Sequence, residues 1–146
     1  MRPRAQNPPS RFHATHLDYD EGEAPSAPVT LVDDTSRSIV AENDSPDVGF
    51  RFSVNPYRGC YHACAYCYAR PTHEFLGYGA GTDFERTLVV KRTAPELLRA
   101  RFERSSWTGE HVVFSGVTDP YQPVERELGL TRDCLEVCAE YRNPAG

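Results

Sequence analysis

Residues 50–70, with the sequence FRFSVNPYRGCYHACAYCYAR, hold three of the five cysteines in this 146-residue chain. Cys60, Cys64 and Cys67 are separated by three and then by two residues. Thiols this close on one loop can converge on an inorganic centre, and an odd number of cysteines argues against a disulfide framework. Gly59 permits a tight backbone turn beside the first thiol. Because structural zinc and ordinary iron–sulfur centres take four ligands, three thiolates indicate a centre with one position open to a small molecule.

The sequence around this loop predicts strands and helices in alternation. Residues 50–54 (FRFSV) alternate apolar and polar side chains, which predicts a strand that stops at Asn55-Pro56. Further strands are expected at residues 86–91 and 111–115, and helices at residues 71–76, 93–104 and 131–141. Alternating strands and helices imply parallel strand pairing with right-handed crossovers. The expected fold class is therefore α/β.

Two of the expected helices carry specific signals. Thr93 and Glu96 have the spacing of a capping box at the start of the first. In the second, Cys134, Cys138 and Tyr141 recur at helical spacing and share one face. We expect these two cysteines to be buried as small hydrophobic residues.

The front third of the chain differs in composition from the rest. Residues 1–50 contain four Arg and nine Asp or Glu, whereas residues 51–146 contain twelve of each sign. With six prolines and few large apolar side chains, residues 1–49 are expected to be a disordered or extended acidic tail, with one short strand within residues 36–43. Residues 50–146 hold about three βα units of roughly 30 residues. We expect them to form an incomplete domain, the N-terminal piece of a longer protein.

Composition also excludes some classes of protein. No apolar run approaches the roughly 18 residues that span a membrane, so we expect no membrane partner. The first residues, MRPRAQNPPSRF, lack the form of a signal peptide, which predicts a cytoplasmic location where disulfides are rare. The formal charge of −5 argues against a generic nucleic-acid binder.

The cysteine motif resembles the signature of radical S-adenosylmethionine (SAM) enzymes, C-x3-C-x-aromatic-C, with Tyr66 at the aromatic position. The resemblance implies that Cys60, Cys64 and Cys67 hold a 4Fe–4S cluster whose fourth iron is chelated by SAM. It also implies that Tyr66 packs near the adenine. One-electron reduction of the bound sulfonium would release a 5′-deoxyadenosyl radical that abstracts hydrogen from a substrate. The implied fold is the N-terminal part of a partial (β/α)6 barrel, with its active site at the carboxyl ends of the strands.

Two longer segments resemble one branch of that superfamily. NPYRGCYHACAYCYAR (residues 55–70) and SGVTDPYQPVE (residues 115–125) are similar to the branch related to spore photoproduct lyase, a DNA repair enzyme. The resemblance covers residues 50–146 and implies a lyase-like enzyme supplied by a one-electron donor such as a flavodoxin or ferredoxin. A nucleic-acid partner follows by analogy only. The substrate and the catalytic residues stay open.

The resemblance also points to the loop that follows the strand at residues 111–115. In radical SAM enzymes, polar groups at the end of the second barrel strand contact the methionine amino group. Ser115, Gly116, Thr118 and Asp119 occupy that place and are expected to bind the cofactor. A carboxylate there can bind an ammonium group through a charge-assisted hydrogen bond.

The metal centre has a second interpretation. The three cysteines can instead form a structural zinc site, with His62, Cys134 or Cys138 as the fourth ligand. The chain is then a non-catalytic zinc or iron–sulfur module.

Other residues near the motif have a second interpretation as well. Tyr66 can be a packing residue, and Asp119 can serve only to open a turn. Arg58 and Arg70 flank the loop, where they either bind a carboxylate or phosphate or are ordinary surface residues.

Overall fold

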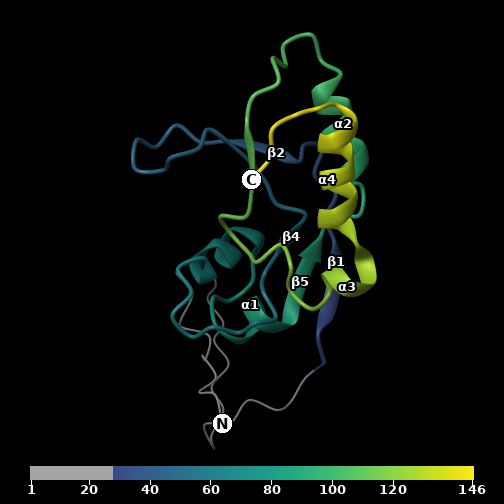
Figure 1. The fold of residues 1–146 in the computed structure, drawn as a ribbon. Coiled ribbons are helices and arrows are strands. Elements are labelled where there is room, and N and C mark those ends of the chain that lie inside the picture. Colours follow the sequence, from purple (N-terminus) through teal and green to yellow (C-terminus); the bar gives the residue numbers. More distant parts are fainter. Residues whose placement is uncertain (1–27) are drawn as a thin grey trace, which may run out of the picture.

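The computed structural model describes residues 28–146, so the expectation for residues 1–27 lies outside the described residues. Two small mixed sheets form the centre of the molecule, and Figure 1 shows helices α2 and α4 side by side along one flank. The first sheet contains, in order, β1 (Thr30–Asp33), β5 (Thr87–Val90) and β4 (Tyr57–Arg58). The second contains β2 (Val40–Glu42), β3 (Phe52–Val54) and β6 (Val112–Phe114).

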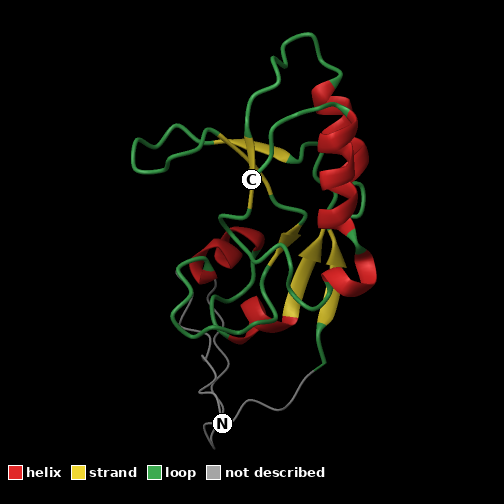
Figure 2. Cartoon of the chain, viewed as in Figure 1, coloured by secondary structure: helices red, strands yellow, loops and turns green. Residues whose placement is uncertain are grey.

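Five helical segments connect these strands, and long loops make up much of the rest of the described chain (Figure 2). They are η1 (Arg70–Leu76, a 3-10 helix), α1 (Thr82–Arg86), α2 (Ala94–Phe102), α3 (Glu125–Leu128) and α4 (Leu130–Glu140). Within residues 28–146, we find no helix with the length and apolar character needed to cross a membrane.

Parallel pairing, expected from the alternation of strands and helices, occurs in both sheets. β1 runs parallel to β5, and β3 runs parallel to β6. Beyond β6, Val112 forms a parallel bridge with Ala145, and the amide of Gly146 donates to the carbonyl oxygen of Val112 at 3.0 Å. The antiparallel pairs β2–β3 and β4–β5 were not expected. These partner strands have only three and two residues, too few for a periodic signal in the sequence.

The main core lies between the second sheet and helices α2 and α4. Phe52, Val54, Val112 and Phe114 of the sheet meet apolar residues of both helices, including Leu98. Trp107, in the loop after α2, lies against the ring of Phe102 with centroids 5.3 Å apart. This packing holds β3 and β6 as rigid neighbours, which fixes where the loops that follow them begin.

Most strands and helices lie where the sequence predicts them. The predicted helix at residues 71–76 is a 3-10 helix that ends at Gly77, whose φ of 82° is left-handed. The capping box was wrong: Thr93 makes no side-chain hydrogen bond at the start of α2, because its backbone is not extended as a capping residue requires. The sequence analysis missed four elements, all of five residues or fewer: β1, β4, α1 and α3.

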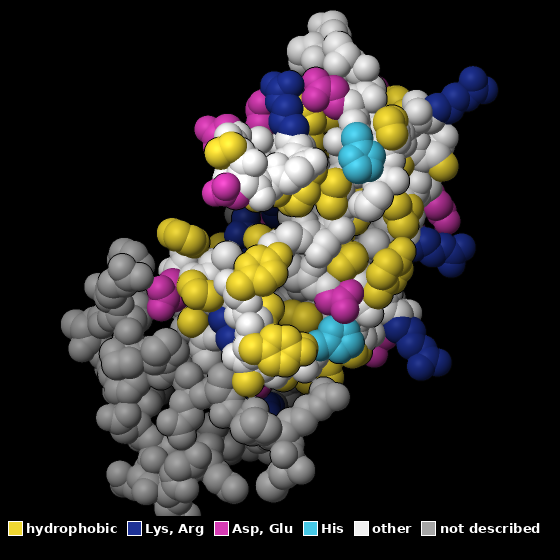
Figure 3. Space-filling view, turned by 60° about the vertical axis from the view of Figure 1, so that its left-hand side comes forward, with side chains coloured by type: hydrophobic (Ala, Val, Ile, Leu, Met, Phe, Trp, Pro, Cys, Tyr) yellow, Lys and Arg dark blue, Asp and Glu magenta, His cyan; other side chains and the backbone are white. Residues whose placement is uncertain are grey.

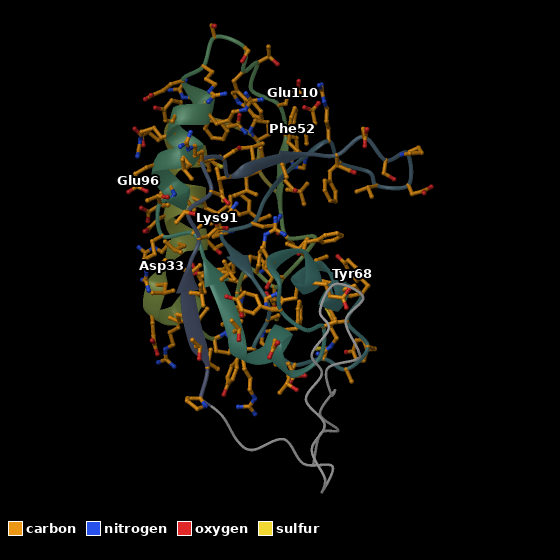
Figure 4. All side chains as sticks on the ribbon, turned by 180° about the vertical axis from the view of Figure 1, so that it is seen from behind. Asp33, Phe52, Tyr68, Lys91, Glu96 and Glu110 are labelled. Carbon is orange, nitrogen blue, oxygen red and sulfur yellow. The ribbon has the colours of Figure 1, made fainter. Side chains whose placement is uncertain are left out.

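The two sheets are connected through a buried lysine at the end of β5. The Lys91 ammonium donates to the carbonyl oxygen of Ser38 at 3.2 Å and lies 3.8 Å from a carboxylate oxygen of Asp34. Burial lowers the pKa of Lys91. Asp34 follows β1 and Ser38 precedes β2, so the side chain of Lys91 contacts both ends of the segment that joins the two sheets. Lys91 is labelled in Figure 4.

Candidate functional site

The three clustered cysteines lie in the segment between β4 and η1, here called the cysteine loop (residues 59–69). Successive turns fold this loop, since the amide of Ala63 donates to the carbonyl oxygen of Cys60 and that of Cys67 to the carbonyl oxygen of Cys64. All three thiols are free; Cys60 is buried, whereas Cys64 and Cys67 are partly exposed. Within residues 28–146, no three His, Cys, Asp or Glu side chains form a group that could hold a metal ion.

A glycine starts the loop at a point where no side chain fits. Gly59 has a φ of +79°, and a Cβ there would lie 2.9 Å from the carbonyl oxygen of Phe84 and 3.0 Å from that of Thr87. The amide of Cys60 donates to the same Phe84 oxygen at 2.9 Å. The tight turn expected at Gly59 is therefore confirmed, and it presses the first cysteine against the junction of α1 and β5.

The loop after β6, here called the second loop (residues 115–124), packs directly against the cysteine loop. Thr118 donates its hydroxyl to the carbonyl oxygen of Gly59 at 2.7 Å. Gln122 donates to the same oxygen at 3.2 Å and accepts from the amide of Tyr61 at 3.0 Å. The hydroxyl of Tyr68 donates to the carbonyl oxygen of Gly116 at 2.7 Å. The structure thus brings together the two segments to which the resemblance points.

The four residues expected to bind the cofactor have different environments in the second loop. Ser115 and Gly116 have φ angles of 117° and 114°, a conformation unusual for serine, and the Ser115 hydroxyl donates to the carbonyl oxygen of Thr118. Thr118 is buried, and its hydroxyl serves the contact with Gly59. Ser115 and Gly116 therefore shape the backbone, and Thr118 joins the two loops.

Asp119 is exposed and has two partners. One carboxylate oxygen lies 3.1 Å from Nε2 of His62 in the cysteine loop. The other accepts the amide of Tyr121 at 2.8 Å, which forms the turn given above as its alternative role. Asp119 therefore combines a turn with a contact between the loops, while its carboxylate remains accessible to solvent.

Several tyrosine side chains on the cysteine loop and beside it are exposed to solvent. Tyr66 is 90% exposed and Tyr68 is 79% exposed. Tyr61 and Tyr121 are exposed as well. Figure 3 shows hydrophobic side chains gathered on one face of the molecule beside acidic and histidine side chains. Tyr66 therefore makes little contact within the described chain.

Arg70 is a functional candidate that the sequence analysis did not place correctly. The interpretation as a surface residue was wrong for Arg70, which is only 6% exposed. Its guanidinium forms an ion pair with Glu85 at 2.6 Å and donates from Nε to the carbonyl oxygen of Cys64 at 2.9 Å. No signal in the sequence indicates that Arg70 is buried, because α1, the helix that contains its partner Glu85, was not predicted.

A buried hydrogen bond between a tyrosine and a glutamate connects the elements that flank the two loops. The hydroxyl of Tyr57 donates to a carboxylate oxygen of Glu125, and burial raises the pKa of Tyr57. Glu125 accepts the amides of Thr131 at 3.1 Å and Arg132 at 3.0 Å, in the first turn of α4. The strand before the cysteine loop is thereby connected to the helix after the second loop.

The remaining two cysteines belong to the core, as predicted. Cys134 and Cys138 of α4 are buried among the apolar residues between the helices and the second sheet. Burial raises the pKa of both thiols, that of Cys138 to about 11. Both side chains therefore behave as small hydrophobic residues.

Comparison with known proteins finds relatives that are described as uncharacterized proteins. A protein of Mycobacterium tuberculosis is 51% identical over 95 residues, which cover 65% of this chain and 28% of that protein. A protein of Methanocaldococcus jannaschii is 33% identical over 88 residues, covering 60% of this chain and 31% of that protein. The chain thus matches less than a third of the length of these relatives. No family model matches the chain, and neither does any solved structure.

Proposed function

We propose that this chain is the N-terminal part of a radical SAM enzyme of the spore photoproduct lyase-like branch. Cys60, Cys64 and Cys67 hold a 4Fe–4S cluster, and SAM binds beside it against the second loop. The observation that carries the proposal is the packing of the cysteine loop against the second loop through Thr118 and Gly59. Gly59 and Thr118 lie 59 residues apart in the chain. In the proposed site, the cysteine loop supplies the cluster ligands and the second loop supplies the groups that bind SAM.

The donor set suits such a cluster chemically. Three free thiols stand on one short loop, and iron–sulfur clusters are held by cysteine thiolates. Because a cluster places its irons at separate corners, its ligands need not converge on one point as they do around a single ion. Bound there, the cluster would supply one electron to the sulfonium of SAM, which is the chemistry that the protein itself cannot provide.

The arrangement of strands supports a partial barrel. β3 and β6 are parallel neighbours, Ala145 continues the same parallel order beside β6, and α2 and α4 follow in alternation. The cysteine loop comes after β3, separated from it only by β4, and the second loop follows β6 directly. Active sites of barrel enzymes lie at the carboxyl ends of the strands. The second loop begins at such an end, and the cysteine loop begins after β4, which pairs with β5 in the other sheet.

The residues of this chain would bind and orient the cofactor. Gln122 and Thr118 fix the backbone around Gly59, and Asp119 offers an exposed carboxylate for the methionine ammonium. Tyr66, exposed on the cysteine loop, is available to cover the adenine. Aromatic side chains at this position would reduce the access of water to a reactive centre.

The proposal includes partners and a location. A low-potential cluster requires a one-electron donor such as a flavodoxin or ferredoxin. An iron–sulfur cluster held by cysteine thiolates suits a reducing compartment, so the proposal includes a cytoplasmic location. A lyase acting on nucleic acid is the activity that the branch suggests, by analogy alone.

The test is anaerobic reconstitution of the full chain with iron and sulfide. We expect about four irons per chain, an electron paramagnetic resonance (EPR) signal that SAM alters after reduction, and 5′-deoxyadenosine formed from SAM under dithionite. Cys60→Ala, Cys64→Ala and Cys67→Ala should each abolish the SAM-sensitive signal. Cys134→Ala is the matched control, because that thiol lies in the core.

Two results would reject the enzyme. Tight uptake of one zinc ion with no nucleoside product would instead support a non-catalytic metal-binding module. A cluster that assembles but needs Cys134 or His62 as a fourth ligand would leave no position for SAM, and would also reject it.

A further inference from the structure

A buried ion pair lies directly against the cysteine loop. Arg70, the first residue of η1, is 6% exposed, and Glu85 of α1 is 4% exposed. Nη2 of Arg70 donates to the Glu85 carboxylate at 2.6 Å. Nη1 donates to the carbonyl oxygens of Gly81 at 2.9 Å and Ala80 at 3.3 Å. Both terminal guanidinium nitrogens are thereby occupied.

The third nitrogen makes the contact that matters for the site. Nε of Arg70 donates to the carbonyl oxygen of Cys64 at 2.9 Å. The guanidinium also lies over the ring of Phe84, 5.3 Å from its centroid, and Phe84 packs against Cys60. The Arg70 guanidinium therefore contacts both the backbone of Cys64 and the ring of Phe84, which packs against Cys60.

Stability alone does not explain this arrangement. A buried ion pair contributes little more than well-packed apolar residues of the same volume, because both charges must leave water. What it does provide is direction, since a planar guanidinium donates along fixed lines. Such donors beside a metal site orient the ligands and tune the centre, although they never touch it.

We infer that Arg70 is the positioning residue of the cysteine loop: by holding the Cys64 carbonyl, it sets the placement of that thiol as a cluster ligand. The inference rests on the proposed function. Glu85 keeps the guanidinium in place, and the carbonyls of Ala80 and Gly81 fix its plane. A lysine at position 70 keeps the charge, but its single ammonium cannot donate in these separate directions at once.

Two variants of the full chain test the inference. Arg70→Lys keeps a positive charge beside Glu85 but loses the planar guanidinium, which donates in several fixed directions at once. Arg70→Met combined with Glu85→Leu removes both charges, a replacement that commonly leaves stability unchanged. After anaerobic reconstitution, we expect both to lose the cluster to an iron chelator roughly 10-fold faster or more, the usual size of such effects on metal affinity. The EPR signal of the reduced cluster should also change shape.

Arg99→Lys is the matched control. Arg99 forms an ion pair with Glu140 at 2.7 Å, but on the surface between α2 and α4. This variant should match the unsubstituted chain in iron content, chelation rate and EPR signal. Far-UV circular dichroism of each iron-free chain shows whether the fold is kept.

The outcomes separate the two proposals. If the unsubstituted chain takes up no iron, the proposed function fails. If it forms the cluster and both Arg70 variants hold it with unchanged chelation rate and EPR signal, only the inference about Arg70 fails. The inference is also overturned if both variants lose the fold, because Arg70 would then be a structural residue. Folded variants with a labile, altered cluster support it.

Discussion

The side-chain amide of Gln122 donates to the carbonyl oxygen of Gly59, 63 residues earlier in the chain, at 3.2 Å and so joins the two loops. Its oxygen accepts the amide of Tyr61 at 3.0 Å, so one buried side chain pairs with the backbone on both sides of Cys60. A third bond connects Gln122 to the hydroxyl of Thr118 at 3.1 Å. Together with the hydroxyl of Thr118, this amide group fixes the first cysteine against the second loop.

Gln122→Met should destabilise the protein. Methionine has a similar shape but leaves the part-buried amide of Tyr61 without this acceptor and removes the buried bonds to Gly59 and Thr118, which costs about 1–3 kcal/mol. The free energy of unfolding in urea measures the loss. Glu127→Met, at an exposed position of α3, is the control and should change stability by less than about 0.5 kcal/mol. Equal effects of the two substitutions would contradict the role assigned to Gln122.

Gly59→Ala and Gly109→Ala form a matched pair. Both glycines have left-handed backbones, with φ of +79° and +75°. A Cβ at Gly109 meets nothing within 4 Å, whereas at Gly59 it meets two carbonyl oxygens and the ring of His73. Both variants carry the left-handed strain of about 1–2 kcal/mol. Gly59→Ala should lose a further 1–3 kcal/mol or so from crowding. Thermal unfolding of both variants measures these losses. Equal losses would show that the cysteine loop shifts without cost to make room for the added Cβ.

The core cysteines should resist alkylation in the folded chain. Burial raises the pKa of Cys138 to about 11, so only about one thiol in a thousand is thiolate at pH 8. Iodoacetamide followed by peptide mass analysis should modify Cys64 and Cys67 first, and Cys134 and Cys138 only on unfolding. Rapid modification of Cys134 in folded protein would contradict its place in the core.

Acid should weaken the fold through His73. Burial lowers the pKa of this histidine below its ordinary value of 6.5, so the folded state favours the neutral ring. The unfolded chain then binds the proton first. The stabilisation is fully present above pH 6.5 and is lost as the pH falls from there through the folded-state pKa, with a slope of at most about 1.4 kcal/mol per pH unit.

His73→Gln removes this titration while keeping a donor for the carbonyl oxygen of Thr87, which Nε2 of His73 contacts at 2.9 Å. The difference in urea midpoint between pH 7.5 and pH 5.5 should shrink in this variant. His111→Gln, at an exposed position, should leave that difference unchanged. An unaltered difference in His73→Gln would assign the acid sensitivity to other groups.

The strands and helices that the sequence predicts are those whose signal lies within their own residues. The strands at β3, β5 and β6 and the helices α2 and α4 have apolar residues at strand or helix spacing, which any chain with this pattern would bury. β4, α1 and α3 escaped notice because two to five residues with mixed polarity show no helix or strand period. β1 escaped notice because it lies in the acidic, proline-rich front of the chain, whose composition predicts an extended tail. The capping signal at Thr93 failed because the local backbone, fixed by β5 before it, takes another conformation.

The candidate site divides in the same way. The sequence alone determined the spacing of Cys60, Cys64 and Cys67 and the glycine that precedes them, and the proposed chemistry rests on that spacing. Only the tertiary structure decided what holds them, because Arg70, Glu85 and Gln122 act through contacts across many residues of chain. The sequence alone does not show whether a charged or amide side chain is solvated or buried. Its role is therefore fixed only when folding removes water from around it and supplies the partners that replace that water.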